Sequence, residues 1–288
     1  MSKLTLTCSL LLLHSALWAP NAYAKWFLSK DIYTVAHQKL LEGNTRESFD
    51  AMVQAWQQSP NRDEQTNLNE LLQLAITEDC GHSLNATNLP EWITKLVIQR
   101  EMVQNQTQVL PRLSINGIAK KNVTKIEFTR WPDQAVIAGI PKMDEGNAFS
   151  IDAKRLENAT SEGLYQLNIQ VEGHPEGFKT WVILTQPQSK QRIGWINSKT
   201  WRIERNGIPD RVCPAPILSM NVYDLNDTSW TPLWTENVDG KLPTTLPKID
   251  LPEGRYWLSV GIIESRWQGD ISVLDIQRIT RPVDYPGI

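Results

Sequence analysis

Glu162-Gly163-Leu164-Tyr165-Gln166-Leu167-Asn168-Ile169 and Glu253-Gly254-Arg255-Tyr256-Trp257-Leu258-Ser259-Val260 are two copies of one pattern, E-G-x-Y-x-L-x-(I/V). In both copies apolar residues alternate with other residues from the tyrosine onward, and a period of two is typical of a β-strand with one buried face. The pattern therefore predicts two similar strands in the C-terminal two thirds of the chain, one in each of two structural modules.

The repeated strand resembles the penultimate strand of immunoglobulin-like and fibronectin-type sandwiches. In those folds a turn glycine precedes a tyrosine whose hydroxyl bonds back to the backbone of the corner. The resemblance implies two β-sandwich modules, residues 109–188 and 189–288, with Tyr165 and Tyr256 at the two corners. Each module also has a candidate early core strand, at 123–128 and 217–223.

Residues 25–108 have a helical period instead. Four apolar stripes with this spacing predict four helices with short connections: Ile32, Val35, Ala36 and Leu40; Phe49, Met52, Val53 and Trp56; Leu68, Leu71, Leu72, Ala75 and Ile76; Trp92, Leu96 and Val97. Three pairs of residues have the spacing of a capping box and mark the expected starts of the second, third and fourth helices: Asn44 and Glu47, Asn61 and Glu64, Asn88 and Glu91.

The second stripe resembles the second half of a tetratricopeptide repeat. The matching residues are Gly43, Asn44, Ser48, Phe49, Met52, Ala55, Trp56 and Pro60. The following segment does not repeat them, so true repeat ancestry and generic helix packing both stay open. The expected fold class is a multi-domain α plus all-β protein: N-terminal, repeat-like helical hairpins followed by two immunoglobulin-like β-sandwich modules.

The first 24 residues have the three parts of a signal peptide. Lys3 is followed by an apolar run around 10–13 and by Ala22-Tyr23-Ala24, with small residues where the peptidase requires them. The run is shorter than the roughly 20 residues that span a bilayer. We expect cleavage after Ala24, a mature chain without a membrane span, and a periplasmic or secreted location. The overall layout is similar to a family of uncharacterised exported proteins of gammaproteobacteria, which carries no established activity.

The charge balance is mildly acidic. The net charge is −3, and removal of residues 1–24, which contain one Lys and no acid, leaves 28 basic and 32 acidic residues, or −4. No block of basic residues stands out. This composition disfavours nucleic acid and anionic lipid as partners.

Two cysteines remain in the expected mature chain, Cys80 and Cys213. In an oxidising compartment a pair is more often a disulfide than two free thiols, although two buried thiols are the alternative. A bridge between residues so far apart in the chain contributes about 4–5 kcal/mol in the chain-entropy model.

No catalytic pattern is present. His37, His82 and His174 lie outside any H-E-x-x-H motif, and there is no C-x-x-C pair, nucleophile elbow or glycine-rich nucleotide loop. We therefore expect no metal, no cofactor and no enzymatic activity. Two carboxylates that converge in space leave an envelope hydrolase as an alternative.

Tryptophan is abundant, and four tryptophans are candidates for a binding surface. Trp257 lies between Tyr256 and Leu258, which point inward, so its own ring points outward. Trp267, Trp230 and Trp234 lie near predicted turns. Packing of these rings between modules is the alternative.

Three functions follow from these observations. The first is a non-catalytic envelope adaptor whose helical part docks a protein partner, with the sandwiches as spacers. The second is a glycan-binding or cell-wall-binding module that uses the outward tryptophans. The third is the envelope hydrolase.

Overall fold

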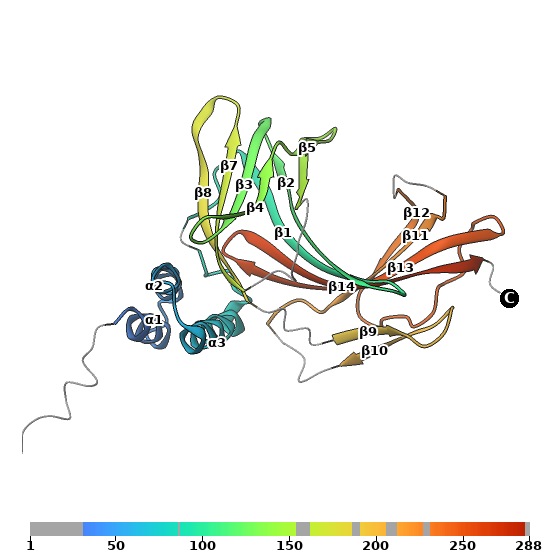
Figure 1. The fold of residues 1–288 in the computed structure, drawn as a ribbon, viewed down its shortest axis with the longest axis horizontal. Helices are drawn as coiled ribbons and strands as arrows, with labels where there is room; N and C mark the ends of the chain where they lie inside the picture. The colour runs from blue at the N-terminus through green and yellow to red at the C-terminus, as the bar shows by residue number, and fades with distance from the viewer. Residues whose placement is uncertain are drawn as a thin grey trace, which may run out of the picture.

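The computed structural model describes residues 31–85, 87–153, 162–185, 191–205, 212–226 and 231–285. Three helices lie together at one end of the molecule, and strands form the rest (Figure 1). The expected signal peptide (1–24) and Trp230 lie outside the described residues.

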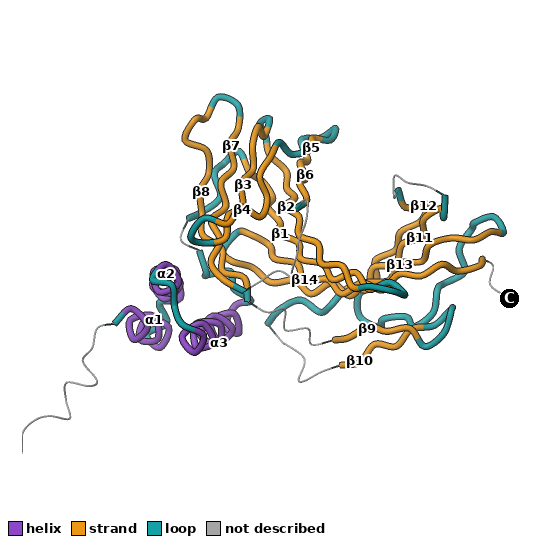
Figure 2. The backbone as a smooth tube through the Cα atoms, in the orientation of Figure 1, coloured by secondary structure: helices purple, strands orange, loops and turns teal. Residues whose placement is uncertain are grey.

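The helical layer consists of α1 (Ile32–Leu41), α2 (Thr45–Gln57) and α3 (Arg62–Asp79). The predicted capping box is present at α3, where the Asn61 side chain accepts from the backbone of Glu64 and the Glu64 side chain accepts from the backbone of Asn61. The three predicted apolar stripes are largely buried against one another and against Leu164 and Ile183 of the neighbouring sheet. The helices thus cover one end of the β-structure (Figure 2).

The strands form three sheets. The eight-stranded sheet has the order β12-β11-β13-β14-β1-β2-β6-β5, the four-stranded sheet β4-β3-β7-β8, and the third contains β10-β9. Their bounds are β1 (Ile93–Gln104), β2 (Val109–Ala119), β3 (Val123–Arg130), β4 (Gln134–Gly139), β5 (Lys142–Met143), β6 (Ala148–Asp152), β7 (Gly163–Val171), β8 (His174–Leu184), β9 (Gln191–Trp195), β10 (Trp201–Arg205), β11 (Ile217–Asp224), β12 (Pro232–Val238), β13 (Gly254–Gln268) and β14 (Ile271–Tyr285).

The predicted fourth helix is wrong. Its residues form β1, which lies inside the large sheet between β14 and β2. Leu96 and its neighbours fit a helical stripe over one turn, but Leu96, Ile98 and Arg100 also alternate as a strand requires, and the tertiary pairing decides the outcome.

The two immunoglobulin-like modules are also wrong. The Tyr165 strand (β7) is an inner strand of the four-stranded sheet, whereas the Tyr256 strand (β13) lies inside the eight-stranded sheet. That sheet joins strands from all three expected segments, and β1 and β14 pair in parallel. Local alternation identified both strands correctly but cannot say which strands become neighbours. No tetratricopeptide array is confirmed either, since only α1–α3 are helical in the described part of the chain.

The eight-stranded sheet has a covered face and a concave face. The covered face packs against the four-stranded sheet through residues such as Ile98, Leu113, Ile115, Phe149 and Val273. Farther along the same face, Met220, Val222, Leu258, Val260 and Ile279 pack with Ile193 and Trp201 of β9–β10. In Figure 1 both ends of the sheet rise on one side of β13 and β14, and β9–β10 lie on the other side, so the uncovered face is the inside of the curve.

Candidate functional site

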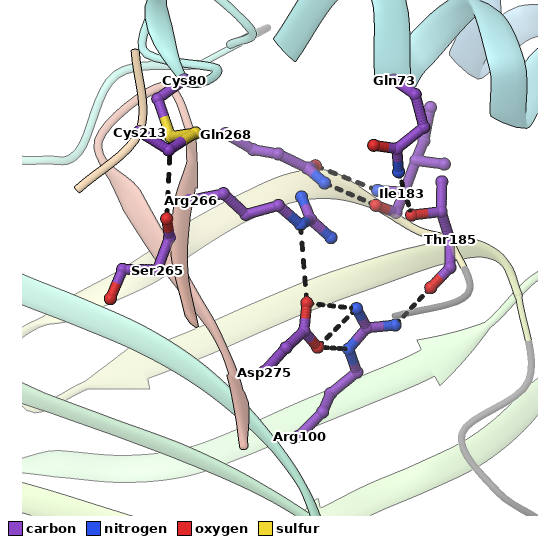
Figure 3. A network of polar contacts seen from close by, with 10 residues as sticks. All are labelled: Gln73, Cys80, Arg100, Ile183, Thr185, Cys213, Ser265, Arg266, Gln268 and Asp275. Atoms are coloured by element: carbon purple, nitrogen blue, oxygen red, sulfur yellow. Dashed lines mark hydrogen bonds and ion pairs between the residues drawn. A yellow bond between two sulfur atoms is a disulfide. The ribbon is translucent and has the colours of Figure 1, made fainter. Parts of the chain in front are cut away.

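A buried ion pair joins the large sheet to the rest of the molecule on the covered face (Figure 3). Arg100 of β1 and Asp275 of β14 are register partners, and two hydrogen bonds connect them, Nε to Oδ1 at 2.6 Å and Nη2 to Oδ2 at 2.8 Å. The remaining guanidinium nitrogen, Nη1, donates to the backbone oxygen of Thr185 at the end of β8. The Arg100 side chain is only 2% exposed, so this pair is a structural junction between two sheets.

A second arginine in the junction is poorly satisfied. Arg266 of β13 is 9% exposed, and its Nε lies 3.9 Å from Asp275 Oδ2. Its two Nη atoms are buried without a hydrogen-bond partner among the described residues. Burial lowers the pKa of Arg266 to about 10, against the opposing influence of Asp275. Two guanidinium groups thus lie against one carboxylate, that of Asp275.

Two glutamines continue the junction toward the helices. Gln268 of β13 accepts from the backbone nitrogen of Ile183 through Oε1 at 3.0 Å and donates to its backbone oxygen. Gln73 of α3 donates to the Thr185 hydroxyl at 2.8 Å. The end of β8 is therefore held between α3 and the large sheet (Figure 3).

The predicted Cys80–Cys213 disulfide is present, with the Cα atoms 5.0 Å apart. Cys80 ends α3 in the left-handed conformation, and its backbone oxygen accepts from Trp267 at 2.9 Å. Gly81 follows with φ +87°, and a Cβ there would lie 2.1 Å from the Trp267 oxygen, so only glycine allows this approach. The bridge fixes the end of the helical layer beside β13.

The concave face carries a second ion pair. Glu101 of β1 bonds to Arg278 Nε of β14, and Arg278 Nη1 lies 3.2 Å from the Ser259 hydroxyl. A Cβ on Gly261 would lie 3.2 Å from the Arg278 Cζ atom, so the guanidinium rests on the bare backbone of β13. This pair lies on the face opposite the Arg100–Asp275 pair, because Glu101 directly follows Arg100 on β1, Arg278 lies three residues after Asp275 on β14, and successive side chains of a strand point to opposite faces.

Small polar side chains extend this site across β13, β11 and β12. Asn221 donates to the Ser219 hydroxyl at 3.3 Å and accepts from the Thr235 hydroxyl at 2.9 Å. Ser219, Asn221 and Ser259 are each buried, at 5%, 7% and 3% exposed. We call Ser219, Asn221, Ser259, Arg278 and Glu101 the polar strip.

Two apolar rows border the polar strip. Tyr223, Trp257 and Pro282 are successive cross-strand partners and form an aromatic row, with all three side chains partly buried. Burial raises the pKa of Tyr223; Arg278 opposes this effect and Glu101 adds to it. On the other side of the strip, Ile217, Ile263 and Ile276 form an isoleucine row. The concave face thus alternates between apolar and polar bands.

The other predicted surface tryptophans do not join Trp257. Trp267 stacks on His82 with ring centroids 4.3 Å apart, at the loop that follows α3. Trp234 of β12 packs against the apolar cluster of the covered face. Of the four candidates, the structure describes three, and Trp257 alone of these lies in the aromatic row.

The two predicted corner tyrosines are both buried. The Tyr256 hydroxyl donates to the Pro252 backbone oxygen at 2.9 Å, the local contact that the corner pattern predicts. Tyr165 stacks on Phe128 with centroids 4.7 Å apart. The local tyrosine contact therefore forms at Tyr256 in a fold that is not a sandwich of the expected kind.

Sequence reasoning missed Glu101, Arg278, Tyr223 and Asn221. Glu101 lies within the segment 25–108 that the sequence predicts to be helical, and nothing local links it to Arg278. The sequence holds one signal for Tyr223 and Asn221. The alternation in 217–223 places these two residues on the same face of their strand.

In the part of the chain that the structure describes, no three His, Cys, Asp or Glu side chains are grouped so as to hold a metal ion. None of the helices described has the length and hydropathy of a transmembrane span.

The fold and the site together define a class: a curved, disulfide-braced β-protein with a helical layer at one end and a banded concave face. The chain belongs to the family described as "Protein of unknown function (DUF2861)", whose model matches residues 26–284. A search of the curated proteins found no match.

Proposed function

We propose that this protein is a non-catalytic binding protein of the periplasm or of the extracellular space. The observation that carries the proposal is the concave face, where polar side chains lie between two apolar rows and no described hydrophobic cluster packs. The disulfide supports a location in an oxidising compartment. The signal peptide expected at 1–24 would deliver the chain there.

The binding surface in this proposal is the sheet and not the helical layer. The apolar stripes of α1, α2 and α3 are already used to pack on one another and on the four-stranded sheet. The covered face is likewise occupied by β9–β10 and the four-stranded sheet. A rigid scaffold of this kind suits a surface that stays in one shape before and after binding.

Affinity capture from a cross-linked envelope extract tests the proposal. The bait is the full chain, compared with a Thr280→Arg variant. Thr280 of β14 is the register partner of Ser259, so the variant places a long side chain beside the polar strip without removing a large packed group. We expect material that the unchanged chain retains and the variant loses. Identical retention by both baits would contradict a binding role for this face.

Glycan binding is favoured as the second candidate by the position of Trp257. Its ring lies beside Tyr223 on the uncovered side, and aromatic side chains combine an apolar ring with a polar atom. The choice between a protein and a glycan ligand depends on the chemistry of the whole face.

A further inference from the structure

We infer that the concave face binds a linear, largely uncharged oligosaccharide, which lies along β13 from the aromatic row to the isoleucine row. This inference rests on the proposed function and specifies its ligand.

The charge of the polar strip is already balanced. The carboxylate of Glu101 is bonded to the guanidinium of Arg278, and the other members of the strip are neutral hydroxyl and amide groups. Arg112, the register partner of Glu101, adds one exposed positive charge at the margin. The polar strip has no net charge that would attract a strongly charged partner. An uncharged, hydroxyl-rich ligand instead matches a neutral strip of hydrogen-bond donors and acceptors.

The banding suits a pyranose chain in particular. A sugar ring has apolar C–H faces and polar hydroxyl edges, so it requires apolar and hydrogen-bonding surface side by side. The row of Tyr223, Trp257 and Pro282 can pack against C–H faces, and Arg278, whose side chain is 14% exposed, is the adjacent hydrogen-bonding group. A protein interface of comparable size instead centres on a continuous apolar core.

The length of the face favours several sugar units. Trp257 and Ile263 are six residues apart on β13, which is roughly 20 Å of extended strand at about 3.4 Å per residue. A monosaccharide would contact one band only. An oligosaccharide would contact the aromatic row, the polar strip and the isoleucine row together.

The test uses the full chain and defined probes. Chitohexaose, cellohexaose and maltohexaose, their monosaccharides and purified peptidoglycan sacculi are titrated or sedimented with the protein. We expect one hexasaccharide to bind at least tenfold more tightly than its monosaccharide. We also expect Trp257→Ala and Thr280→Arg to weaken that binding at least tenfold. The matched control Trp131→Ala, in the turn between β3 and β4 of the four-stranded sheet, should change it less than twofold.

Two variants guard against a folding artefact. Trp257→Ala removes a half-buried ring and is checked by its thermal transition, whereas Thr280→Arg adds a side chain on the same face and keeps the ring. Retained affinity in both variants would overturn the inference, because binding would then occur elsewhere. Absence of binding to every hexasaccharide and to sacculi would also overturn it.

The same variants separate this inference from the proposed function. If envelope capture yields a protein that Thr280→Arg loses, and no glycan probe binds, the glycan inference fails while the binding function stands. If Thr280→Arg loses neither captured protein nor glycan, both fail.

Discussion

Arg100 and Glu101 are neighbours on β1, yet the ion pairs that they form differ in what surrounds them. Arg100 and Asp275 lie on the covered face, beneath the end of β8, and Thr185 completes their hydrogen bonds. Glu101 and Arg278 lie on the concave face, where the Arg278 side chain is 14% exposed against 2% for Arg100. One sheet thus carries a pair that holds layers together and a pair that a ligand could reach.

Removal of the disulfide should have the largest effect, because the unfolded chain regains the entropy of a loop closed over a sequence separation of 133, and the end of α3 loses its covalent bond to Cys213. A Cys80→Ala/Cys213→Ala variant is expected to lose about 4–5 kcal/mol of unfolding free energy in the chain-entropy model. Denaturant titration measures the loss, and hydrogen exchange should show greater opening at Thr185 than at Ser259. Equal hydrogen exchange at Thr185 and Ser259 would contradict the expected difference between the covered face and the concave face.

Truncation of the covered pair should come next. Asp275→Ala leaves Arg100 and Arg266 buried without their carboxylate, and a cost of about 3–5 kcal/mol is expected. Denaturant titration of the purified variant tests this value. A loss below about 1 kcal/mol would mean that water reaches the junction.

Truncation of the concave pair should cost less. Glu101→Ala leaves Arg278 able to recover water from the uncovered side, and we expect a loss of about 1–3 kcal/mol, measured beside Asp275→Ala. If the two variants lose the same stability, the concave face is as closed as the covered one.

The smallest effect is expected at Arg266 and should have the opposite sign. Arg266→Met removes two unpartnered buried nitrogens, and a gain of about 1 kcal/mol is expected near neutral pH. The pKa of Arg266 is lowered to about 10 by burial, so the unfolded chain binds more protons above that pH and the stability of the unchanged protein rises there. The advantage of the variant should therefore shrink above pH 10. A clear loss of stability in Arg266→Met would show that the arginine has a favourable partner.

Several features could be predicted because they are local. The helical stripes of α1 to α3, the Asn61 capping box and the strand at Tyr256 each depend on residues within a few positions of one another. The Cys80–Cys213 bond was predictable for a different reason, since the expected mature chain holds only these two cysteines.

The neighbours of each strand could not be predicted in this way. Trp92 and Leu96 fit one helical turn, so the sequence predicts a helix where β1 forms. The partner strand of β1, β14, is about 175 residues away in the chain. The ion pairs at Asp275 and Arg278 depend on that pairing, so the candidate site could be foreseen only at Trp257, where alternation alone fixed the direction of the ring.

The parallel contact of β1 with β14 also sets an order of events in folding. The last strand of the chain lies between β13 and β1 and contributes residues to both large clusters, through Val273 at one end and Ile279 at the other. A chain that stops before β14 therefore has two separate half-sheets with no shared centre. Contacts of such high sequence separation are slow to form, so the large sheet is expected to close late, after synthesis of the whole chain.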